Sequence, residues 1–141
     1  MRPADRPSTR RWLLLPAAVL VLSGLAAGCS SSKPAYCAAA SQLKSSVQDL
    51  GNVTINVHDL SSVNTAVSKV QADAKTFASE AKSAYPSQTT ALKTSLSGLQ
   101  AAVTSAIGQP SLTTVAAVVS SVTQVKTAAS NLQNAASGKC Q

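Results

Sequence analysis

The sequence predicts an all-α domain, an antiparallel up-down-up-down four-helix bundle with a short first helix and an extended connection over residues 51–60. Three observations lead to this prediction. Apolar residues recur every three or four positions in four separate segments, which is the spacing of one helix face. Glycine and proline fall between several of these segments. Two cysteines, Cys37 and Cys140, flank the whole helical region.

The first two segments each place their apolar residues on one helix face. We expect Gly51 to stop the first helix as the residue after its C-cap. The first face is Tyr36, Ala39, Leu43, Val47 and Leu50, and the second is Val63, Val67, Val70, Ala74, Phe77, Ala81 and Ala84.

The last two segments are bounded by helix start and stop signals. Pro86 suits the first turn of the third helix, and Ser111 suits the N-cap of the fourth, which we expect Gly138 to end. The fourth segment is rich in valine and could suit a strand, but about 26 residues is far too long for one strand. The third face is Leu92, Leu96, Leu99, Val103 and Ala106, and the fourth is Val115, Val118, Val122, Val125, Ala129, Leu132 and Ala136.

The connection over residues 51–60 has a different pattern. Val53, Ile55 and Val57 alternate with polar residues, and this period of two is typical of extended chain. One interpretation is a lid over the open end of the core. The other is an edge that recognises a partner protein by strand addition. The sequence favours the lid and leaves Val53, Ile55 and Val57 as a candidate partner-contact segment.

Cys37 begins the first helix and Cys140 follows the last. In an up-down-up-down bundle these two points lie at the same end, so we expect a disulfide, provided that the domain is exported. A loop of about 100 residues closed in this way stabilises the fold by roughly 4–5 kcal/mol in the chain-entropy model. The alternative is a redox or metal pair, but neither C-x-x-C spacing nor a neighbouring histidine accompanies the cysteines.

The N-terminus has the layout of an export signal. Four arginines against one acid precede an uncharged stretch from Trp12 to Ala27, which is shorter than the roughly 20 residues of a membrane span. The run Leu25–Cys29 then resembles the lipobox of bacterial lipoproteins, although Ala26 stands where that family usually has leucine. The resemblance implies cleavage before Cys29 and lipid modification of its thiol with acyl chains such as palmitate.

This resemblance divides the chain into three parts. Residues 1–28 are the expected signal peptide, residues 29–34 the acylated cysteine and a short tether, and residues 35–141 the bundle domain. The protein would then sit on the outer face of the cell membrane. Arg10 and Arg11 before an apolar run also resemble a twin-arginine export signal, which leaves the export route open.

Composition argues against a nucleic-acid partner. From Cys29 onward the chain has eight lysines, four acidic residues and no arginine, and its aromatic residues are Tyr36, Phe77 and Tyr85. Proteins that bind nucleic acids rely on arginine and on stacking aromatics. Dispersed lysines near anionic lipid headgroups are the better expectation.

No residue set predicts catalysis, a metal site or a cofactor. His58 is the only histidine, and a loop histidine beside Asp59 is usually solvated or part of a cap. A metal site in a bundle needs inward-facing Glu-x-x-His pairs, which are absent. Lys69 and Asp73 are spaced for a surface ion pair.

We therefore expect a membrane-anchored, non-enzymatic envelope lipoprotein that acts as a small structural or protein-interaction module. In its signal and composition it resembles small actinobacterial envelope lipoproteins. The alternative is a carrier that binds a small apolar ligand inside the bundle. Alanine-rich helix faces argue against a large cavity, and an apolar pocket of about 300 Å³ or more would favour the carrier.

Overall fold

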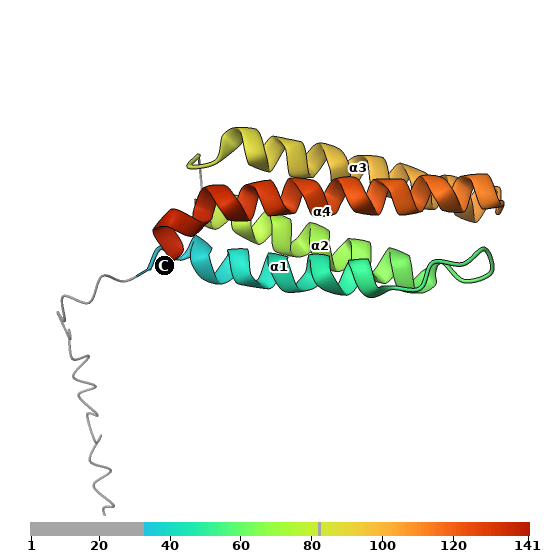
Figure 1. The fold of residues 1–141 in the computed structure, drawn as a ribbon, viewed down its shortest axis with the longest axis horizontal. Coiled ribbons are helices and arrows are strands. Elements are labelled where there is room, and N and C mark those ends of the chain that lie inside the picture. Colours follow the sequence, from blue (N-terminus) through green and yellow to red (C-terminus); the bar gives the residue numbers. More distant parts are fainter. Residues whose placement is uncertain (1–32, 82) are drawn as a thin grey trace, which may run out of the picture. The chain divides into compact units, whose positions relative to one another are not determined.

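The computed structural model describes residues 33–81 and 83–141, which form one compact unit. Its helices are α1 (Tyr36–Asn52), α2 (Ser61–Ala81), α3 (Pro86–Gly108) and α4 (Leu112–Cys140). Each helix packs against two others, in the order α1, α2, α3, α4 and back to α1 (Figure 1). The predicted all-α bundle with a short first helix is therefore confirmed.

The helices alternate in direction. Tyr36 at the start of α1 contacts Phe77 near the end of α2 and Tyr85 just before α3. Cys37 at the start of α1 is bonded to Cys140 at the end of α4. The start of α1, the end of α2, the start of α3 and the end of α4 thus meet at one end of the bundle. We call this the disulfide end, and the opposite end, with residues 53–60 and 109–111, the loop end.

The core lies along the predicted apolar faces. The partly buried exceptions are Tyr36 and Val115, and Ala84 is exposed because it falls beyond the end of α2. The core also takes in Leu60 and Ala128, which the helical pattern did not include. The fully buried large side chains include Leu43, Phe77, Leu92, Leu99 and Leu132.

Two helices end later than the sequence predicts. Gly51 does not stop α1, which continues through Asn52, and Gly138 does not stop α4, which continues through Cys140. Gly51 remains helical, and the side chain of Lys126 from α4 lies over it, 3.3–3.4 Å from where a Cβ would be. Near Gly138, the disulfide holds Cys140 beside α1, and α4 continues past this glycine to Cys140.

The expected helix starts are confirmed where the sequence signals them. Pro86 is the first residue of α3. Ser111 caps α4: its Oγ accepts a bond from the Thr114 backbone N–H at 3.1 Å, and the Thr114 hydroxyl accepts one from the Ser111 N–H at 3.0 Å. This reciprocal pair satisfies backbone donors that a helix start leaves free.

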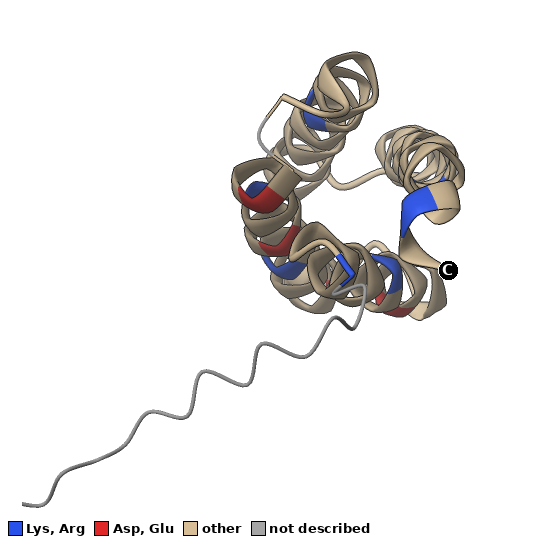
Figure 2. Ribbon diagram, turned by 90° about the vertical axis from the view of Figure 1, so that its left-hand side faces the viewer, with Lys and Arg blue, Asp and Glu red and all other residues tan. Residues whose placement is uncertain are grey.

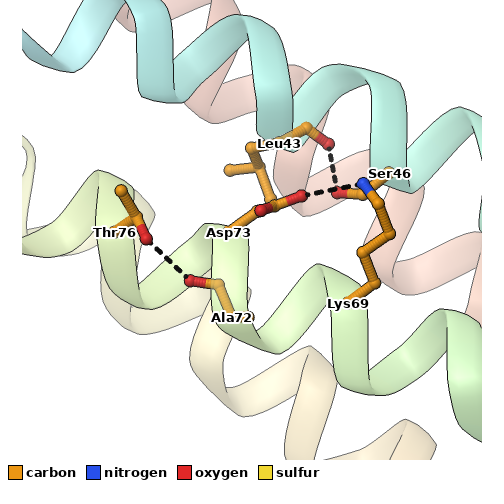
Figure 3. A network of polar contacts seen from close by, with 6 residues as sticks. All are labelled: Leu43, Ser46, Lys69, Ala72, Asp73 and Thr76. Carbon is orange, nitrogen blue, oxygen red and sulfur yellow. Dashed lines mark hydrogen bonds and ion pairs between the residues drawn. The ribbon is translucent and has the colours of Figure 1, made fainter.

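The surface holds the expected ion pair. Lys69 Nζ lies 3.3 Å from Asp73 Oδ2 one turn away on α2 (Figure 3). On the facing helix α1, Ser46 is the buried polar residue of the described core, and its hydroxyl donates to the Leu43 carbonyl at 3.1 Å. The polar group is therefore satisfied without a partner from another helix.

Candidate functional site

The structure brings Cys37 and Cys140 together as a disulfide with their Cα atoms 5.5 Å apart. The bond links the first turn of α1 to the last residue of α4, so it closes almost the whole domain into one loop. The predicted pairing is confirmed. The predicted lipidation residue, Cys29, lies outside the described residues.

The aromatic residues of the described chain gather beside this disulfide end. Tyr36, Phe77 and Tyr85 have ring centroids 5.5–6.2 Å apart, and two of the three pairs meet edge to face. The two tyrosine hydroxyls are hydrogen-bonded at 3.2 Å. That hydrogen bond, with a smaller effect of burial, raises the pKa of Tyr85 above its ordinary value. The sequence pattern assigned these residues to core faces and gave no sign that they form one cluster.

The connection is shorter than predicted, because Gly51 and Asn52 belong to α1 and only residues 53–60 join the two helices. It forms no strand; a single bridge pairs Asn56 with Asp59 across a turn. Val53 and Ile55 pack against the core from the loop end, whereas Thr54 and Asn56 are exposed. This alternation matches the predicted period of two and fits the lid interpretation. Recognition of a partner by Val53, Ile55 and Val57 stays a prediction.

Asp59 caps the start of α2 instead of pairing with His58. Its Oδ1 accepts bonds from the Ser61 hydroxyl at 2.6 Å and the Ser61 backbone N–H at 3.0 Å. These two bonds lower the pKa of Asp59, the hydroxyl contributing more. The His58 backbone N–H donates to the Asn56 side chain at 3.0 Å, and the His58 residue is exposed. His58 thus belongs to a turn, and Asp59 belongs to the cap at the start of α2.

The cavities of the described residues are surface grooves between helices. The groove between α2 and α3 has a volume of about 350 Å³, with Ala74 and Leu96 at its floor and Lys75 and Lys93 at its sides. A hydrogen bond of 3.1 Å between Gln71 and Gln100 crosses it. Its volume exceeds 300 Å³, and its lining combines the apolar Ala74 and Leu96 with glutamine, serine and lysine side chains.

Charge is distributed unevenly among the helices. Asp49 lies on α1, Asp59 precedes α2, and Asp73 and Glu80 lie on α2. Helices α3 and α4 carry lysines but no acidic residue (Figure 2). Within residues 33–81 and 83–141, no group of three or more His, Cys, Asp and Glu side chains could hold a metal ion. No helix in this part of the chain is both long and apolar enough to cross a membrane.

Comparison of the chain with models of protein families, with curated proteins and with solved structures gives no match.

Proposed function

We propose that this protein is an envelope lipoprotein, held on the outer face of the cell membrane by acyl chains on Cys29, whose helical bundle acts as a non-enzymatic structural or protein-interaction module. The observation that carries the proposal is the lipobox-like run Leu25–Cys29 at the end of an uncharged stretch. The first helix of the bundle begins at Tyr36, a short distance along the chain from this cysteine.

The disulfide supports export. Disulfides persist in oxidising compartments outside the cytoplasm and are rare inside it. Cys37 and Cys140 use up the two cysteines that follow Cys29, which leaves the thiol of Cys29 for lipid.

The length of the tether supports a particular orientation. Six residues lie between Cys29 and Tyr36, and the seven Cα-to-Cα steps that join them reach about 25 Å at most when fully extended. A lipid on Cys29 would therefore keep the disulfide end near the membrane. Helix α4 has 29 residues and is about 43 Å long at 1.5 Å per residue. The loop end can then stand well clear of the lipid, where another envelope protein can reach it.

The alternative role, a carrier for a small apolar ligand, has less support. Leucine, valine, alanine and Phe77 side chains fill the interior, and the grooves lie at the surface. The groove between α2 and α3 is the part of the domain that this alternative would use. Asp59 accepts its hydrogen bonds from Ser61 and not from His58, so this neighbouring pair in the described chain gives no support to an acid–base role.

Membrane fractionation of cells that express the full chain tests the anchor. We expect Cys29→Ala either to enter the soluble fraction or to remain an uncleaved precursor, and to lose incorporation of radiolabelled palmitate. Ser30→Ala is the matched control and should stay acylated and membrane-bound. A processed Cys29→Ala protein that still sediments with membranes would refute the anchor.

A further inference from the structure

Most lysines of the described chain lie near the disulfide end. They fall within eight residues of the helix terminus at this end, which is about 12 Å along a helix axis at 1.5 Å per residue. All of them are exposed, and each of the four helices carries one, as Figure 2 shows in a view from this end. We call this set the basic-end lysines: Lys33, Lys44, Lys75, Lys93 and Lys139.

Acidic residues do not cancel this charge. Asp73 and Glu80 lie within the same distance of the disulfide end, so five lysines and two carboxylates leave a side-chain charge of +3 there. In the rest of the described chain two lysines and two carboxylates cancel, namely Lys69, Lys126, Asp49 and Asp59. The net side-chain charge of the described residues therefore lies in the part of the bundle nearer the disulfide.

The loop end has a different surface. The segments that build it, residues 53–65 and 103–122, contain no lysine or arginine and a single carboxylate, Asp59. The large apolar side chains that are exposed in the described chain all lie in these segments, namely Ile107, Leu112 and Val119. The two ends therefore suit different partners, and the disulfide end is the one that attracts anions.

We infer that the basic-end lysines rest on an anionic phospholipid surface and hold the bundle upright on the membrane. The inference rests on the proposed anchor, because a reach of about 25 Å from Cys29 keeps this end near the lipid, whereas the loop end lies about 43 Å away along α4. A lysine within the screening length of about 8 Å from an anionic surface strengthens binding roughly fivefold. The lipid chains and the lysines would then act on the same end of the molecule.

The placement of these lysines suits an extended surface better than one small anion. Lys75 and Lys93 line the groove between α2 and α3, whereas Lys33 precedes α1 and Lys139 lies at the end of α4. A membrane presents many phosphates at once, so lysines on different helices can bind it together. Helices α1 and α3 begin at the disulfide end, and the Cα–Cβ bonds of Lys44 and Lys93 therefore tilt toward the lipid.

Vesicle binding by residues 33–141 tests the inference without the anchor, because these residues hold all four helices, the core and the disulfide. We expect binding to vesicles that contain phosphatidylglycerol, release in high salt, and no binding to pure phosphatidylcholine. Lys93→Gln combined with Lys139→Gln should weaken binding by at least about fivefold. Lys69→Gln combined with Lys126→Gln removes the same charge farther from the lipid and should weaken binding by less than about twofold.

Three results would overturn the inference. They are equal binding to the neutral vesicles, equal losses from the two pairs of substitutions, and binding of dissolved polyphosphate that is as tight as vesicle binding at the same phosphate concentration. Circular dichroism confirms that each variant keeps its helices. The result does not depend on Cys29, so failure of the anchor and failure of this inference are distinguishable.

A second measurement shows which end faces the lipid. Ser87→Cys and Thr113→Cys place a fluorophore at exposed positions in the first turns of α3 and α4, which begin at opposite ends of the bundle. On vesicles with nitroxide-labelled headgroups, we expect stronger quenching of the label at residue 87. Equal quenching would mean that the bundle lies flat, and stronger quenching at residue 113 would mean that the apolar loop end enters the lipid. Either result overturns the inference.

Discussion

The two ends of the bundle are held by different interactions. At the disulfide end, a covalent bond joins α1 to α4, and Tyr36, Phe77 and Tyr85 pack together across three elements. At the loop end, the connection between α1 and α2 covers the core, and the caps at Asp59 and Ser111 start the next helices. The disulfide end is thus fixed by strong, long-range contacts, and the loop end by several weak and local ones.

The core side chains differ between the ends as well. Leu43, Phe77, Leu92 and Leu132 lie within the half of the bundle nearer the disulfide. The core of the loop end holds Leu50 and Leu60 with the smaller Val63, Val103 and Val118. The largest fully buried side chain, Phe77, thus lies nearer the disulfide. Because the free energy gained on burial grows with apolar area, Phe77 adds to the stability of the disulfide end.

The largest effect is expected from breaking the disulfide. Replacing both Cys37 and Cys140 with serine should lower the free energy of unfolding by about 4–5 kcal/mol, because the unfolded chain regains the entropy of a loop of about 100 residues. Chemical denaturation followed by circular dichroism measures this loss. Helix content in the absence of denaturant should survive. A loss below about 1 kcal/mol would show that the disulfide end does not dominate stability.

The next effect concerns the connection. Replacing Val53, Ile55 and Val57 together with threonine should cost about 1–2 kcal/mol, since Val53 and Ile55 pack on the core but are only half-buried. Val57→Thr alone is the matched control and should change stability little, because Val57 faces the groove beside Ile107. If the triple variant is as stable as the wild type, residues 53–60 are not a lid.

Removal of the cap on α2 should have a smaller effect. Asp59→Ala should lower the melting temperature slightly, because the first N–H of α2 and the Ser61 hydroxyl lose their acceptor. The pKa of Asp59 is lowered in the folded state, so its contribution is present above the ordinary pKa of about 3.9 and is lost as the pH falls through the folded-state value. Thermal unfolding from pH 7 to pH 2 should show that the wild type and Asp59→Ala converge in acid. Curves that stay parallel would contradict this account.

The smallest effect is expected when one glycine near each end of the bundle is replaced with alanine. Gly138→Ala near the disulfide end meets no atom within 4 Å and should stabilise the domain by up to about 0.5–1 kcal/mol through helix propensity. Gly51→Ala near the loop end gains the same propensity but must displace the Lys126 side chain. We therefore expect a smaller gain there, measured as the difference in denaturation midpoint. A larger gain at Gly51 would mean that Lys126 moves freely.

Sequence patterns alone predicted most of this fold. Helical period located four helices, and the positions of Cys37 and Cys140 at the two outer helix ends predicted their bond. Pro86 and Ser111 predicted where α3 and α4 begin. These features are local, because a residue's spacing and its own hydrogen-bonding groups decide them.

The ends of α1 and α4 were not predictable in this way. Gly51 and Gly138 look like stop signals, but neither acts as one. Glycine permits a helix end without forcing it. The Lys126 side chain packs over Gly51 in α1, and the disulfide holds Cys140 just beyond Gly138 in α4. Contacts with other helices thus accompany the extra helical residues at both ends. Helix α1 therefore contains Gly51 and Asn52, which the sequence analysis assigned to the connection.

Only the tertiary structure decided which residues share an end. The sequence treats Tyr36, Phe77 and Tyr85 as members of different helix faces, and it gives Ile107, Leu112 and Val119 no common role. Antiparallel packing brings the first set to the disulfide end and the second to the loop end. The chain thus encoded its helices and their disulfide locally, whereas the crowded aromatic end and the exposed apolar end arose from packing distant turns together.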